Sequence, residues 1–176
     1  ALPPPLSGPE FGSYAPDEVG WLLTDLSAVA LEAPTEEREE AVQSGGRHYA
    51  ESLPIEYVPS PAYTEAFEIA LRSSADAVAQ AVGVVAELIR DARGDHPVLV
   101  SLARAGTPVG ILLRRWWNAS YGIELDHYAV SIVRGKGIDQ TAMRWLAERY
   151  DPARIMFVDG WTGKGAIVRE LAAALD

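Results

Sequence analysis

Three short apolar runs in the second half of the chain alternate with segments of helical composition. The runs cover 96–102, 127–133 and 154–158, and their aliphatic and β-branched residues predict buried strands. Helices are predicted after these runs, at 109–117, from Asp139 as an N-cap, and at 166–175. Strands that alternate with helices predict an α/β fold with a parallel sheet and crossover helices.

The first half of the chain has a different pattern. Prolines at 3, 4, 5, 9 and 16 predict a flexible arm over 1–16, which leaves 17–176 as the domain. An N-terminal helical extension is expected, with short helices at 17–25 and 35–43. A long helical stretch follows, with a break near 73–74, and its apolar positions are assigned to the core: Tyr63, Phe67, Leu71, Val78, Val82, Val85 and Ile89.

The turn after the last predicted strand has the composition of an anion-binding site. Asp159 is the first polar residue past that strand, and the turn continues through Gly160, Trp161, Thr162, Gly163, Lys164 and Gly165. Backbone N–H groups at a helix N-terminus favour a phosphate, and glycine lets the backbone approach it. The pattern is not a nucleotide-triphosphate loop, because its first glycine and its Ser or Thr are missing. A Gly-rich turn without a chemical role is the alternative.

Two further turns carry cationic residues. Arg104, Ala105 and Gly106 follow the first strand, where the guanidinium suits phosphate oxygens and Gly106 is expected to let the backbone approach a ligand. Arg134 and Lys136, in the sequence RGKG, are expected on a mobile loop that closes over an anion. For the first turn, the alternative is a surface arginine before a helix that has Pro108 in its first turn. For the second, the alternative is a solvated turn without a chemical role.

The combination of three segments is more specific than any one of them. RHYAESLPIEY at 47–57, SIVRGKGID at 131–139 and FVDGWTGKGAI at 157–167 together resemble a phosphoribosyltransferase-like family found beside bacterial tellurite-resistance genes. The resemblance runs from about Tyr14 to the end of the chain. It departs from the usual motif, since Asp159 stands alone instead of in an acidic pair. Some members are labelled cysteine proteases, yet this chain has no cysteine and so no thiol nucleophile.

The resemblance implies a type I phosphoribosyltransferase core that binds phosphoribosyl diphosphate (PRPP) with magnesium and transfers phosphoribosyl to an unidentified nitrogenous base. Asp159 would hold the ribose diol, the 161–165 turn the 5-phosphate, and the 104–106 turn the pyrophosphate. Arg134 and Lys136 would act on the leaving charge, with Arg47 and His48 near the substrate. The alternatives are a noncatalytic PRPP or nucleotide sensor and a structural partner, both in a stress response.

Composition narrows the class of protein. The 176 residues are 48% apolar and suffice for one domain with a core. A net charge of -10 argues against nonspecific nucleic-acid binding. No apolar run is judged long enough to cross a membrane and no leader is evident, so a cytoplasmic location is expected. The histidines are too scattered to predict a metal cluster.

The C-terminal end of the chain carries an expectation of its own. A phosphoribosyltransferase core usually has further strands after the phosphate-loop helix, so truncation at the C-terminus and a further C-terminal domain are expected. A homodimer is one of the oligomeric states that the sequence allows.

Overall fold

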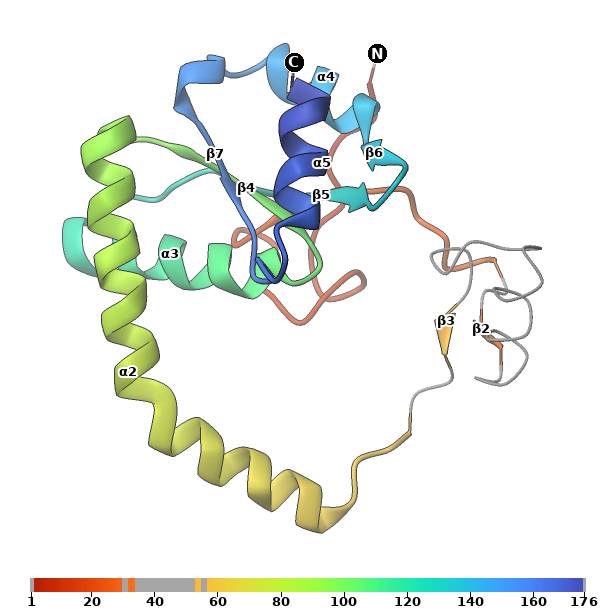
Figure 1. Cartoon of the computed structure of the whole chain (residues 1–176), viewed down its shortest axis with the longest axis vertical. Coiled ribbons are helices and arrows are strands. Elements are labelled where there is room, and N and C mark those ends of the chain that lie inside the picture. Colours follow the sequence, from red (N-terminus) through yellow and green to blue (C-terminus); the bar gives the residue numbers. More distant parts are fainter. Residues whose placement is uncertain (1, 30–31, 34–52, 55–56, 176) are drawn as a thin grey trace. The chain divides into compact units, whose positions relative to one another are not determined.

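The computed structural model describes residues 2–29, 32–33, 53–54 and 57–175 (Figure 1). It divides into two compact units, residues 1–23 with 76–176, and residues 24–75. In the smaller unit β2 (Glu32–Ala33) pairs in parallel with β3 (Leu53–Pro54). Helix α2 (Pro61–Arg93) begins in that unit and ends in the larger one.

The larger unit is built on a parallel sheet. Its strands are β1 (Gly20–Leu22), β4 (Val98–Ala103), β5 (His127–Val133) and β7 (Ile155–Val158), in the spatial order β1-β5-β4-β7. All three pairings along this order are parallel, and the short β6 (Gly137–Ile138) pairs antiparallel to β5. The α/β class with a parallel sheet is therefore confirmed.

Three helices of the larger unit follow the predicted strands. They are α3 (Gly106–Tyr121), α4 (Gln140–Ala147) and α5 (Ala166–Leu175), and a 3-10 turn η2 (Pro152–Arg154) precedes β7. Asp139 caps α4 as predicted, because its side chain accepts hydrogen bonds from the backbone of Thr141 and Ala142 at 2.8 and 3.2 Å. Helix α3 is longer than predicted and ends at Gly122, which has φ of 67°.

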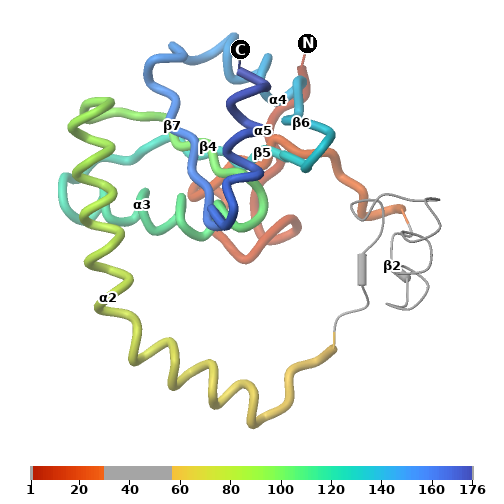
Figure 2. The backbone as a smooth tube through the Cα atoms, in the orientation of Figure 1, coloured from red at the N-terminus to blue at the C-terminus, as the bar shows by residue number. Residues whose placement is uncertain are grey.

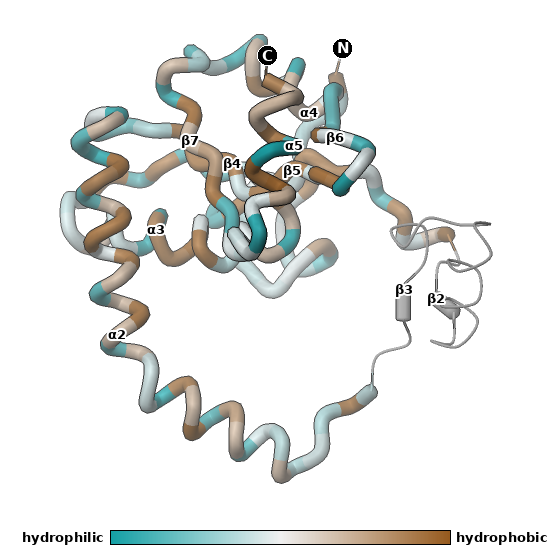
Figure 3. The backbone as a smooth tube through the Cα atoms, in the orientation of Figure 1, coloured by the Kyte–Doolittle hydropathy of each residue, from teal (hydrophilic) through white to brown (hydrophobic). Residues whose placement is uncertain are grey.

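Helices cover both faces of the sheet, which explains why β4 is apolar along almost its whole length. Val98, Val100 and Leu102 pack into one cluster with residues of α4 and α5. Leu99 packs into a second cluster with residues of α2 and α3, including the fully buried Trp117. Figure 3 shows the apolar composition of these central elements.

The N-terminal segment contradicts one helix prediction. Residues 17–25 do not form a helix; Gly20–Leu22 form β1, which joins the edge of the sheet beside β5. Leu6 and Trp21 exchange two backbone hydrogen bonds of 2.9 and 2.7 Å, so part of the Pro-rich segment lies along β1. The predicted helix at 35–43 lies outside the described residues.

Helix α2 is continuous, so the predicted break near 73–74 is wrong. The hydroxyls of Ser73 and Ser74 donate to the carbonyl of Ala70, which satisfies them within the helix. The prediction of a core stripe is wrong for most of its length. Ile89 is buried, whereas Val78 and Val85 are exposed, as are Tyr63, Phe67 and Leu71.

By length and composition alone, α2 is long and apolar enough to cross a bilayer, with a window of mean hydropathy 1.2. The expectation that no run reaches this length is therefore wrong by that measure. A core helix of a soluble protein can meet the same criterion, and Ala86 and Ile89 near the end of α2 do pack into the core. The measure therefore assigns no membrane role.

Candidate functional site

The carboxyl ends of β5, β4 and β7 bring three predicted turns to one edge of the sheet. These strands are parallel neighbours, so the turns at 104–106, 134–136 and 159–165 all leave from that edge. Two of the turns touch, because a Cβ on Gly160 would overlap with the carbonyl oxygen of Ala105. Figure 2 shows the turn after β7, in blue, close to the end of β4, in green. The structure therefore brings the residues of these turns to one edge, as parallel strands require.

The first turn opens helix α3. Ala105 occupies the N-cap position without a side-chain cap, and Thr107 N–H donates to the Arg104 carbonyl at 3.1 Å. Arg104 is exposed and makes no ion pair with a described residue. Its guanidinium is therefore exposed to solvent, and its predicted role in binding an anion stays a prediction.

A glycine is needed at position 106 for a different reason from the one predicted. A Cβ at this position would overlap with the Val158 carbonyl oxygen at the end of β7. The glycine is needed because two backbone segments of the protein approach each other there. The expectation that the fold does not need Gly106 is wrong, and a role of this residue toward a ligand stays a prediction.

In the turn after β7, some backbone N–H groups donate hydrogen bonds to acceptors of the same turn. Asp159 Oδ1 accepts a hydrogen bond from Trp161 N–H at 3.0 Å, and Gly165 N–H donates to the Thr162 carbonyl at 2.8 Å. Two of the five N–H groups that the sequence assigned to a ligand are thus satisfied within the turn. The N–H groups of Thr162, Gly163 and Lys164 make no hydrogen bond with the described residues. The side chain of Trp161 is 75% exposed.

Two buried oxygen atoms of this edge lack a hydrogen-bond partner among the described residues. They are Thr107 Oγ1, at the start of α3, and Asp159 Oδ2. Burying such an atom unpaired costs about 1–3 kcal/mol, so each needs an explanation. A carboxylate oxygen can only accept, so Asp159 suits a ligand group that donates a hydrogen bond.

The turn between β5 and β6 is a short hairpin, and its expected closure over an anion stays a prediction. Lys136 N–H donates to the Val133 carbonyl at 2.9 Å, and Gly135 and Gly137 have φ of 74° and 83°. Gly135 N–H also donates to Glu170 Oε2 of α5 at 3.0 Å. The side chains of Arg134 and Lys136 are exposed, so both cations still face solvent. Arg47 and His48 lie outside the described residues.

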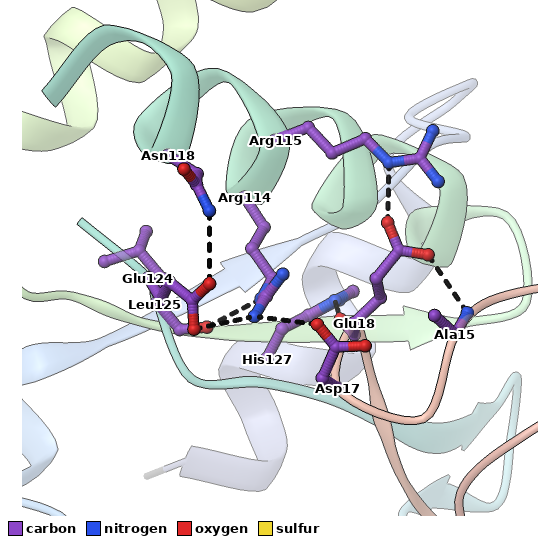
Figure 4. Close-up of polar contacts among 9 residues, drawn as sticks. All are labelled: Ala15, Asp17, Glu18, Arg114, Arg115, Asn118, Glu124, Leu125 and His127. Carbon is purple, nitrogen blue, oxygen red and sulfur yellow. Dashed lines mark hydrogen bonds and ion pairs between the residues drawn. The ribbon is translucent and has the colours of Figure 1, made fainter. Parts of the chain in front are cut away.

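A polar cluster that sequence analysis missed lies at the opposite, amino-terminal edge (Figure 4). Arg114 is 7% exposed, and its Nε donates to the Leu125 carbonyl at 3.1 Å. Its Nη2 lies 3.7 Å from Glu124 and 3.8 Å from Asp17. Arg115 donates to Glu18 at 2.6 Å, and this hydrogen bond holds the pKa of Glu18 below its usual value. These contacts attach the segment before β1 to α3.

A buried serine–histidine pair joins that cluster to the sheet. Ser101 Oγ lies 2.7 Å from His127 Nε2, and His127 Nδ1 lies 3.0 Å from the Glu18 carbonyl oxygen. Burial lowers the pKa of His127 to about 4, so the ring is neutral at neutral pH. A carbonyl only accepts, so Nδ1 carries the proton of the neutral ring and Nε2 is an acceptor. The single Ser101 hydroxyl proton is then shared between Nε2 and the Gly106 carbonyl oxygen, which lies 3.1 Å away.

The pair is structural in this arrangement. Ser101 has no exposed surface and His127 is 4% exposed, so the hydroxyl cannot reach a substrate. Packing requires Gly110 in α3, since a Cβ there would overlap with both side chains. A serine within an apolar strand and a histidine at the start of the next were the only sequence signals.

Comparison with known proteins places the chain in a family. The model of a family described as "Tellurite-like stress resistance cysteine protease StiP" matches residues 12–176. A protein of Acinetobacter baylyi named "Cysteine protease StiP" is 38% identical over 166 residues, which cover 93% of this chain. The chain spans 42% of the length of that relative. No solved structure matches.

These matches correct the functional prediction. The phosphoribosyltransferase family, PRPP as substrate and the noncatalytic sensor are overturned, because family and relative are both named as cysteine proteases. The link to tellurite-like stress resistance agrees with the sequence analysis, and an enzyme is expected at the level of the family name. Magnesium was expected only together with PRPP and conflicts with the protease family. The type I phosphoribosyltransferase fold, a homodimer, the location and the roles of the site residues stay predictions.

Proposed function

Because this chain belongs to the StiP family of tellurite-like stress-resistance proteins, we propose that it forms the part of a stress-resistance protease that binds an acidic peptide segment. The observation that carries the proposal is the cationic edge of the sheet. Arg104 and Arg134 lie on neighbouring turns there without ion pairs to described residues, beside the N–H groups of 162–164. Such groups bind carboxylates well.

The unpaired oxygen of Asp159 supports a peptide as the ligand. A peptide with an acidic residue offers a carboxylate for the arginines and backbone N–H groups for the Asp159 acceptor. A net charge of -10 makes a cationic edge unusual in this chain and therefore informative.

The nucleophile is proposed to come from outside this sequence. Cysteine proteases attack a carbonyl with a thiolate, and donors at fixed positions stabilise the oxyanion that forms. The 176 residues contain no cysteine. The edge described here would therefore position a substrate for a thiol supplied by another segment or another protein.

Titration with a short acidic peptide tests the binding role. Acetyl-Ala-Glu-Ala-amide should shift the backbone amide signals of Thr162, Gly163 and Lys164 in NMR spectra, and acetyl-Ala-Gln-Ala-amide should not. Arg104→Gln should weaken binding about tenfold, the loss of one charge-assisted hydrogen bond. Arg93→Gln, which removes a charge from the end of α2, is the control and should change affinity less than twofold. Equal shifts with both peptides would reject the proposal.

A separate measurement tests the missing nucleophile. The purified chain should not hydrolyse casein, with or without thiol-directed inhibitors, because it has no thiol. Hydrolysis by the chain that disappears in Ser101→Ala would show that the buried serine acts as the nucleophile, and it would overturn this assignment.

A further inference from the structure

A pocket of about 290 Å³ that is wide open to solvent, called the cavity below, lies between the β5–β6 turn and helix α5. Its lining residues are Arg134, Ala166, Arg169, Glu170 and Ala173. No residue of the 104–106 or 159–165 turns lines it. It therefore adjoins the edge described above and shares only Arg134 with it, and Arg169 was not among the predicted site residues.

Backbone contacts fix both walls of this cavity. Arg169 Nη1 donates to the Lys164 carbonyl at 3.0 Å, which anchors one guanidinium and leaves its other N–H groups for a ligand. The next residue of α5, Glu170, accepts through Oε2 a hydrogen bond from Gly135 N–H at 3.0 Å, which ties the turn that carries Arg134 to α5. The two arginines are thus held on elements that are bonded to each other.

The charge of the cavity is positive in an acidic chain. The lining contains two guanidinium groups and one carboxylate, and that carboxylate accepts a hydrogen bond from a backbone N–H. Neither Arg134 nor Arg169 makes an ion pair with a described residue, whereas Arg72, Arg90, Arg114, Arg115 and Arg149 all do. The remaining lining residues are alanines, which leave room and offer no competing acceptor in their side chains.

We infer that this cavity is a second anion-binding site, called the seat below, in which Arg134 and Arg169 bind a carboxylate or phosphoryl group. Planar guanidinium groups suit the oxygens of both kinds of group. The inference rests on the proposed function, since it makes the ligand one with two acidic groups: one at the sheet edge and one in the cavity.

Two amide signals distinguish the seat from the edge. In NMR titrations, Ala173 reports the cavity and Gly163 reports the turn at the edge. The probes are inorganic phosphate and acetyl-Ala-Glu-Ala-amide, which separate a phosphoryl from a carboxylate preference. We expect saturable shifts at Ala173 with at least one probe. Arg134→Gln and Arg169→Gln should each lower the affinity for that probe about tenfold.

Arg144→Gln is the matched control, because Arg144 is an exposed arginine in α4 away from the cavity. It should change the affinity less than twofold. Arg134→Gln keeps the hydrogen bond from Arg169 to the Lys164 carbonyl. It therefore still tests the seat if Arg169→Gln fails to fold. No shift at Ala173, or equal losses in all three variants, would overturn the seat. Shifts at Ala173 without shifts at Gly163 would keep the seat and reject the proposed function at the edge.

Discussion

A Gly106→Val variant should lower the free energy of unfolding by about 2–4 kcal/mol, as overpacking against fixed backbone does. The added Cβ would overlap with the Val158 carbonyl oxygen, and neither partner is a side chain that can rotate away. Relief requires β7 and the start of α3 to separate, which disturbs contacts of both core layers. The result would be seen in urea unfolding followed by circular dichroism.

Ala105→Val is the matched control for this prediction. It adds a β-branched side chain to the same turn, but Ala105 is exposed and has φ of -62°, which any residue adopts. We expect its unfolding free energy to change by less than about 0.5 kcal/mol. If Gly106→Val were as stable as Ala105→Val, then the close approach of the two turns would be wrong and the glycine would serve a ligand.

The stability of the protein should fall as the pH drops from about 6.5 to about 4, by about 3 kcal/mol in total from His127 alone. Burial lowers the pKa of this histidine in the folded state from 6.5 to about 4. The unfolded chain therefore binds a proton in this pH window that the folded chain does not bind. Acid shifts the balance toward the unfolded state, and the contribution is fully present above pH 6.5.

The titration and the stability can be measured independently. The His127 ring signal in NMR spectra should titrate with a midpoint near pH 4, and His127→Gln should flatten the pH dependence of unfolding between pH 6.5 and 4. His96→Gln is the control, since it makes the same change at a histidine whose side chain is exposed. A His127 midpoint near 6.5 would contradict a neutral ring buried against Ser101.

Local pattern was sufficient for the second half of the chain. The run at 127–133 and the helix at 166–175 match the observed elements residue for residue, and Asp139 caps α4. These elements follow from interactions within a few residues, namely apolar periodicity and a side chain that accepts backbone N–H groups. The three turns at one edge also followed, because strand–helix alternation demands parallel strands.

Tertiary structure decided what depends on residues distant in sequence. Gly20–Leu22 became a strand because β5 offers an open edge for pairing, which no local signal around Asp17 reveals. Gly106 is required by the carbonyl of Val158, which is distant in the sequence, and Ser101 meets His127 only across the sheet. Which residues of α2 are exposed likewise depends on which other elements pack against each face of this helix. Sequence thus determined the elements and the edge where the turns meet, and long-range packing determined which residues serve the fold and which are free to bind.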